Sequence, residues 1–84
     1  MITYKIYPMP GICDRALTGA LGTEAVRTVG DLLRAASGRE DTDFLAGVDH
    51  LALLDGKPLD VRRDRDRRVE DGSELVVLPA IMGG

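Results

Sequence analysis

The 84-residue sequence has few of the side chains that build metal, redox and base-stacking sites. Its one cysteine, Cys13, cannot form an internal disulfide, and with one histidine, His50, the ligand cluster that a zinc motif needs is missing. The aromatic side chains Tyr4, Tyr7 and Phe44 are too few for a platform that stacks nucleic-acid bases. We therefore expect a domain without a bound metal or cofactor, in which Cys13 and His50 are structural.

Charge and hydropathy exclude two further classes of protein. Eleven basic and 14 acidic residues give a formal net charge of −3, which argues against broad binding to a phosphate backbone. No apolar run approaches the roughly 20 residues of a membrane span, and residues 1–11 lack the apolar stretch of a signal peptide. These patterns predict a cytoplasmic protein that binds neither nucleic acid nor a membrane.

The length of the chain limits what it can build. Residues 1–84 are enough for one domain with one thin core, because a chain this short buries only roughly 60–65% of its unfolded surface. A deep, dry catalytic cleft in addition to that core is not expected. The size therefore favours a protein that is not itself an enzyme.

Period-two and period-3.6 patterns predict the elements of the N-terminal half. Residues 2–7 alternate as a half-buried strand with Ile2, Tyr4 and Ile6 on one face. A helix is predicted from the apolar stripe Val29, Leu32, Leu33 and Ala36, with Thr28 as N-cap, Asp31 completing a capping box and Gly38 ending it. Between them, residues 12–22 fit a short helix and residues 24–27 a short strand, although Gly19 and Gly22 weaken the helix.

The C-terminal half predicts a hairpin and a central strand. Residues 51–54 and 57–59 are joined by Asp55-Gly56, a turn signal, and Pro58 keeps the second strand short or places it at an edge. Four apolar residues in a row, 75–78, are typical of a central strand that is covered on both sides. Apolar side chains of the acid-rich connection 39–49 are expected to close the bottom of the core. The fold class that follows is α+β, with a mixed sheet of four to five strands and one main packed helix.

Residues 62–68 hold five arginines and two aspartates, a local charge of +3 that we call the arginine cluster. Its aspartates favour a solvated loop in which the charges neutralise one another, and docking to a partner is the alternative.

The C-terminal segment carries a family resemblance. Residues 70–84 read EDGSELVVLPAIMGG, residues 28–33 read TVGDLL and residues 51–59 read LALLDGKPL. In this order, and closed by Gly-Gly, they resemble the ubiquitin-like sulfur carriers, which include the small subunit of molybdopterin synthase and the thiamine-pathway sulfur carrier. The resemblance covers most of residues 28–84, and residues 8–27 depart from it through extra Pro and Gly. It implies a β-grasp fold with residues 79–84 as a flexible tail.

The resemblance also implies a chemistry for that tail. A partner similar to ubiquitin-activating enzymes would use ATP to adenylate the carboxylate of Gly84, and a sulfur donor would convert it to a thiocarboxylate. Pro79, Ala80, Ile81, Met82 and Gly83 would contact partners. The Pro-containing tail is similar to that of the molybdopterin branch, which makes a molybdopterin synthase large subunit a further partner, while the thiamine branch stays open.

Elementary chemistry is compatible with this role. Adenylation gives an unreactive carboxylate a good leaving group, and residues 79–84 can reach roughly 20 Å when extended. Glycine at 83 and 84 has no Cβ, so the backbone fits a narrow channel. The sequence leaves two alternatives open, a ubiquitin-like modifier joined through Gly84 to lysines of other proteins and a non-covalent β-grasp interaction module. It also leaves open whether residues 80–82 complete the buried strand or contact the activating enzyme.

Overall fold

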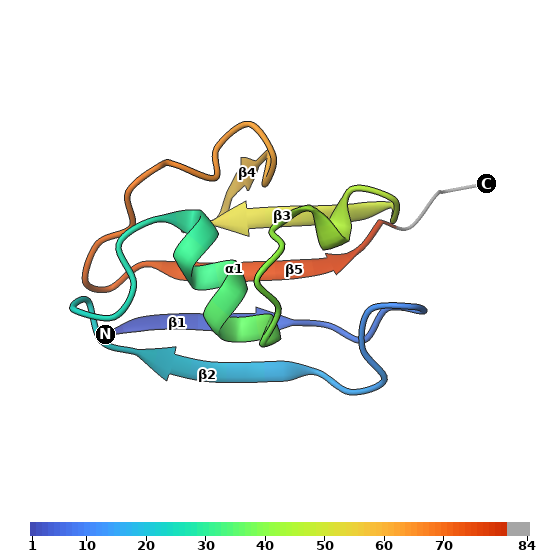
Figure 1. Ribbon diagram of the computed structural model, residues 1–84, viewed down its shortest axis with the longest axis horizontal. Coiled ribbons are helices and arrows are strands. Elements are labelled where there is room, and N and C mark those ends of the chain that lie inside the picture. Colours follow the sequence, from blue (N-terminus) through green and yellow to red (C-terminus); the bar gives the residue numbers. More distant parts are fainter. Residues whose placement is uncertain (81–84) are drawn as a thin grey trace.

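A computed structural model of the chain describes residues 1–80. The elements in chain order are β1 (Ile2–Ile6), β2 (Leu17–Leu21), α1 (Val29–Ser37), the 3-10 turn η1 (Asp43–Leu45), β3 (His50–Leu54), β4 (Lys57–Leu59) and β5 (Glu74–Pro79). The strands form one five-stranded sheet in the order β2-β1-β5-β3-β4, with α1 lying across it (Figure 1). The predicted α+β class, with a mixed sheet and one packed helix, is confirmed.

The sheet is mixed because its central strand has one parallel and one antiparallel neighbour. β5 runs parallel to β1 on one side and antiparallel to β3 on the other, while β1–β2 and β3–β4 are antiparallel pairs. The turn between β3 and β4 uses Asp55 and Gly56, both at positive φ (54° and 81°), as the Asp-Gly signal predicts. β4 is an edge strand, which is where a proline such as Pro58 is tolerated.

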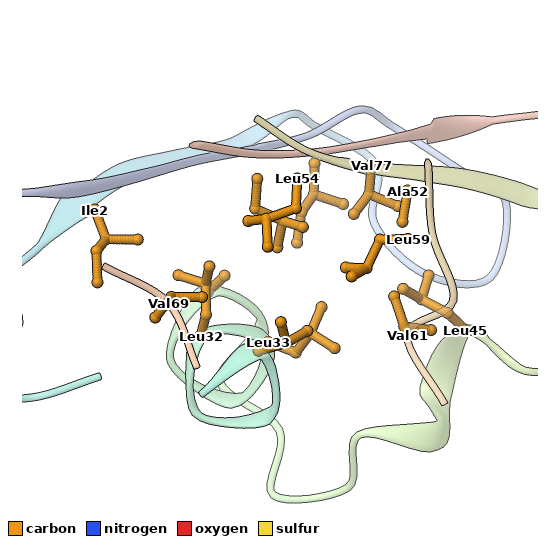
Figure 2. Packing of buried hydrophobic residues seen from close by; sticks show 14 of the residues in the cluster. Ile2, Leu32, Leu33, Leu45, Ala52, Leu54, Leu59, Val61, Val69 and Val77 are labelled. Atoms are coloured by element: carbon orange, nitrogen blue, oxygen red, sulfur yellow. The ribbon is translucent and has the colours of Figure 1, made fainter. Parts of the chain in front are cut away.

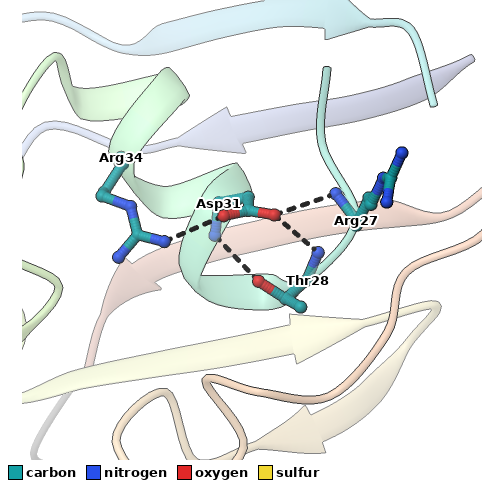
Figure 3. Close-up of polar contacts among 4 residues, drawn as sticks. All are labelled: Arg27, Thr28, Asp31 and Arg34. Atoms are coloured by element: carbon teal, nitrogen blue, oxygen red, sulfur yellow. Dashed lines mark hydrogen bonds and ion pairs between the residues drawn. The ribbon is translucent and has the colours of Figure 1, made fainter. Parts of the chain in front are cut away.

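Helix α1 begins and ends where the capping pattern predicts. The hydroxyl of Thr28 accepts from the backbone N–H of Asp31, and the Asp31 carboxylate accepts from the backbone N–H of Thr28, which completes the capping box (Figure 3). Gly38 ends the helix in the left-handed region at φ 72°, and its N–H donates to the carbonyl of Arg34. The helix is short, so these caps satisfy a large share of its exposed backbone groups.

The core lies between α1 and one face of the sheet (Figure 2). The buried helix residues are the predicted stripe of Val29, Leu32, Leu33 and Ala36, together with Gly30. They pack against side chains that alternate along the strands: Ile2, Ile6, Leu75, Val77, Ala52, Leu54 and Leu59. The connection after α1 closes this core as predicted, with Leu45 buried and with Phe44 and Val48 packed against it.

The prediction for residues 12–27 is wrong in both parts. Residues 17–21 form β2 rather than part of a helix, and residues 24–27 form a turn and an irregular segment rather than a strand. Pairing with β1 outweighs the local pattern, because Leu17 and Leu21 lie opposite Ile6 and Ile2. The glycine that weakens a helix suits this strand: a Cβ on Gly19 would lie 2.5 Å from the Tyr4 hydroxyl oxygen, so the tyrosine ring occupies that space.

Candidate functional site

The strand that leads to the Gly-Gly sequence is held firmly on both sides. Leu75 and Val77 of β5 are fully buried, and the Tyr7 N–H donates to the carbonyl of Val77 at 2.8 Å. Pro79, the last residue of β5, lies opposite His50 of β3 and is half-buried. Hydrogen bonds to two neighbours and a buried inner face fix the direction in which the chain leaves the sheet.

Ala80 follows directly and is exposed. Its backbone N–H donates to the carbonyl of Asp49 at 3.2 Å, so it is still bonded to the segment that begins β3. Of the predicted tail, Pro79 and Ala80 are therefore placed at the end of the sheet, beside the start of β3. The other predicted site residues, Ile81, Met82, Gly83 and Gly84, lie outside the described residues.

Beside the end of β5 lies an apolar surface that the sequence analysis did not identify as a site. It belongs to the sheet face turned away from α1, which we call the outer face (Figure 2). Register places Val76 of β5 opposite Leu53 of β3, and Leu78 opposite Leu51. Leu51 is 41% exposed and the other three are half-buried, so four aliphatic side chains form a contiguous outer patch that ends at Pro79.

Neighbouring strands extend the row of Val76 and Leu53. Lys5 of β1 pairs with Val76, and the exposed Pro58 of β4 pairs with Leu53. The Lys5 ammonium lies 4.7 Å from the centre of the Tyr7 ring, so one basic side chain and one ring border the patch. The patch therefore has an aliphatic centre with a polar and aromatic border, an arrangement typical of docking surfaces.

The outer patch corrects one prediction. Residues 75–78 were expected to be covered on both sides, but within residues 1–80 both α1 and η1 lie on the inner side. Leu75 and Val77 face the core, whereas Val76 and Leu78 reach the outer face and stay partly exposed. The sequence already indicated an uncovered apolar face. Residues 51–54 and 75–78 are apolar on both faces of their strands, and one amphipathic helix can cover only one face of a sheet.

A hollow of about 370 Å³ lies beside β3 and β4. Leu59 and Val61 line it together with the polar side chains of Asp43, His50 and Asp60. The Nδ1 of His50 donates to the carbonyl of Val48 at 2.8 Å, which supports the predicted structural role of this histidine. These groups hold the local fold and do not form a nucleophile–base pair.

The carboxylate of Asp60 is committed to the backbone. It accepts from the N–H groups of Arg62 and Arg63 at 3.0 and 3.1 Å. These bonds, first that from Arg63 and then that from Arg62, hold the pKa of Asp60 below its ordinary value. An ionised, hydrogen-bonded carboxylate of this kind shapes a loop and is a poor general base.

Cys13 likewise has a local contact, since its Sγ lies 3.6 Å from the carbonyl oxygen of Tyr7. Among residues 1–80, no three His, Cys, Asp or Glu side chains are grouped so that they could hold a metal ion. No helix in the described part of the chain has both the length and the apolar character needed to cross a membrane.

Comparison of the chain with family models, curated proteins and solved structures finds no match.

Proposed function

We propose that this chain is a ubiquitin-like sulfur carrier whose C-terminal glycine delivers sulfur as a thiocarboxylate. One observation carries the proposal: in the sequence, the anchored central strand β5 is followed directly by Ala80-Ile81-Met82-Gly83-Gly84. The reactive group then needs no pocket of its own. The chain acts as a co-substrate whose tail enters the active site of an enzyme.

The arrangement of the elements supports a β-grasp fold for this carrier. One helix follows the first hairpin, and the first and last strands lie parallel at the centre of the sheet. The same arrangement places the strand before the tail at the centre of the sheet, bonded to a strand on each side. A rigid base under a short tail limits the volume that the reactive end has to search.

The chemistry proceeds in two steps that the partner catalyses. A carboxylate oxygen of Gly84 attacks the α-phosphorus of ATP, pyrophosphate leaves, and an acyl adenylate forms. Hydrosulfide, as the sulfur donor, then attacks the acyl carbon, the bond from that carbon to the AMP oxygen breaks and AMP leaves, so one oxygen of the original carboxylate is replaced by sulfur. The chain contributes delivery, because glycine at positions 83 and 84 lets the backbone pass a narrow entrance.

The outer patch serves in this proposal as the surface that the activating enzyme recognises. Leu51 and Leu78 lie at the end of the sheet from which the tail departs, next to Pro79 and Ala80. A partner that covers them holds the start of the tail in place. That partner resembles ubiquitin-activating adenylyltransferases, and the molybdopterin branch, with a synthase large subunit as the next partner, is favoured by the sequence from Leu78 to Gly84.

Intact-mass measurement of the protein isolated from its own cells tests the proposal. We expect a fraction of the protein with one oxygen replaced by sulfur, located on Gly84 by fragmentation. The matched variant carries one leucine added after Gly84, and we expect it to fold normally and to show no exchange. An unmodified C-terminus in the presence of ATP, the sulfur donor and the adenylating enzyme would refute sulfur carriage. Gly84 found in isopeptide linkage to lysines of other proteins would identify a protein modifier instead.

A further inference from the structure

The arginine cluster is the most strongly charged segment of the chain. Five of the nine arginines in the sequence fall within residues 62–68, in the connection between β4 and β5. The whole chain has a net charge of −3 and the cluster contributes +3, so the rest of the chain carries −6. The loop thus has a net positive charge, whereas the rest of the chain has a net negative charge.

Buried residues hold this loop at both ends. Val61, before the cluster, is 5% exposed and Val69, after it, is 8% exposed, and both belong to the core (Figure 2). The N–H of Val69 also donates to the carbonyl of Arg27 at 2.9 Å. The ends of the loop are therefore fixed to the domain.

The middle of the loop is bonded to the first turn of α1. The N–H groups of Val29 and Gly30 donate to the carbonyls of Arg67 and Arg65 at 2.9 and 2.8 Å. A Cβ on Gly30 would lie 3.2 Å from the Arg65 carbonyl oxygen, so the loop and the helix are in close contact. The helix N-terminus, which would otherwise leave these donors unpaired, thus fixes the backbone that carries the arginines.

The neighbouring aspartates do not pair with the arginine side chains. Asp60 accepts from the backbone of Arg62 and Arg63, and the carboxylate of Asp64 accepts from the backbone N–H of Asp60 at 3.1 Å. Within residues 1–80, the ion pairs join the N-terminus to Asp71 and Arg34 to Asp31, and none involves the cluster. All five arginines are exposed.

From this geometry we infer that the arginine cluster is a docking surface for a carboxylate-rich surface of a protein partner. Guanidinium groups bind carboxylates in a bidentate manner, and a backbone that is already ordered loses little entropy when they do so. A loop whose arginines only contact solvent does not need an ordered backbone, whereas a loop that binds carboxylates does benefit from one.

The charge distribution favours an acidic protein surface over a nucleic acid. A duplex extends its phosphates well beyond one loop, and there it would meet the acidic residues that give the rest of the chain its charge of −6. A compact group of carboxylates can pair with the cluster without approaching those residues. Its attraction to the loop also orients the two proteins as they meet.

The middle of this loop is bonded to the first turn of α1, through the carbonyls of Arg65 and Arg67. Its beginning lies nearer the end of β5, because Arg62 lines the hollow beside His50, which lies opposite Pro79. The inference concerns docking alone and holds whether or not Gly84 carries sulfur.

Titration of the isotope-labelled full chain with hexaglutamate, followed by NMR, tests the inference. We expect saturable shifts confined to residues 62–68 and to their arginine Nε–H signals. The double variant Arg65→Gln/Arg67→Gln should weaken binding by about tenfold at low salt, because two exposed charge pairs are lost. Its thermal midpoint should stay at that of the unmodified chain, since Val29 and Gly30 bond to backbone carbonyls.

The matched control is Arg15→Gln/Lys57→Gln, which removes the same charge from exposed residues outside the cluster. It should change the affinity by less than about twofold. Equal weakening by both double variants, or shifts spread over the whole surface, would overturn the inference. So would tighter binding of a short duplex DNA than of hexaglutamate at physiological salt, since that result would indicate a nucleic-acid partner.

Discussion

Asp31→Asn tests how far one carboxylate organises the start of α1. Its Oδ2 accepts from the backbone N–H groups of Arg27 and Thr28 at 3.1 and 3.3 Å, and its Oδ1 accepts from the Arg34 guanidinium at 2.8 Å (Figure 3). Asparagine keeps the shape of the side chain but removes the charge and one acceptor oxygen. The variant therefore weakens the capping box without opening a cavity.

The expected loss of stability is modest and comes mainly from the backbone bonds. Loss of a helix-capping side chain costs about 1 kcal/mol. The ion pair with Arg34 adds little, because the Asp31 side chain is 35% exposed and that of Arg34 is 45% exposed. In a domain of this size, such a loss lowers the thermal midpoint by roughly 4–8 °C.

The contribution of the Asp31 carboxylate to stability depends on pH. The backbone N–H of Arg27 and then the Arg34 side chain hold the pKa of Asp31 below its ordinary 3.8. A carboxyl group whose pKa is lower in the folded chain contributes stability that is complete above the unfolded value. That contribution disappears as the pH falls through the folded pKa, because the protonated acid then resembles asparagine.

Urea unfolding at neutral pH and at a pH below the folded pKa of Asp31 measures this difference. We expect the unmodified chain to be more stable than Asp31→Asn at neutral pH and equal to it in acid. The control is Asp14→Asn, whose exposed carboxylate makes no hydrogen bond or ion pair with residues 1–80 and should leave stability unchanged. Equal stability at neutral pH, or a difference that persists in acid, would refute the assigned role of Asp31.

Two further substitutions test the outer patch and the end of the helix. Leu51→Asp should reduce the fraction of thiocarboxylate formed by the activating enzyme by about fivefold or more, since it places a charge on the outer patch. Ala20→Asp adds the same charge to an exposed residue of β2 and should not reduce it; equal fractions for the two variants would contradict docking through the patch. Gly38→Ala should lower the free energy of unfolding by about 1 kcal/mol through its positive φ alone, because no atom lies within 4 Å of the added Cβ. Chemical unfolding of Gly38→Ala beside Gly47→Ala, which has open space and no positive φ, checks this, and equal losses would argue against backbone strain.

Most of the fold could be predicted because local chemistry and burial agree. The apolar stripe of α1, the cap at Thr28 and the turn at Asp55 each specify one conformation by themselves. β2 could not be predicted in this way. Its inward positions hold Leu17, Gly19 and Leu21, and two leucines four residues apart also fit a helix. Pairing with β1 decides between a strand and a helix, and the local pattern of residues 17–21 does not reveal that pairing.

The sequence suggests the Gly-Gly end of the candidate site but not the surface beside it. Gly83 and Gly84 stand out in the sequence as the two glycines that close it, and their role stays a prediction. The outer patch becomes visible only when strand register brings Leu51 beside Leu78. Likewise, the alternation of Asp and Arg in residues 62–68 suggests paired charges, but the carboxylate of Asp64 bonds to the backbone and the ion pairs among residues 1–80 do not involve the cluster.

Both missed surfaces follow from how few elements this chain has. One helix of nine residues covers one face of a five-stranded sheet, so a second apolar face has no cover within residues 1–80. The connection before β5 bonds to the helix N-terminus through the carbonyls of Arg65 and Arg67, and its own backbone N–H groups bind the carboxylates of Asp60 and Asp64. The described part of this small domain thus exposes an aliphatic surface and a cationic surface, and partners of the proposed carrier could recognise it through either one.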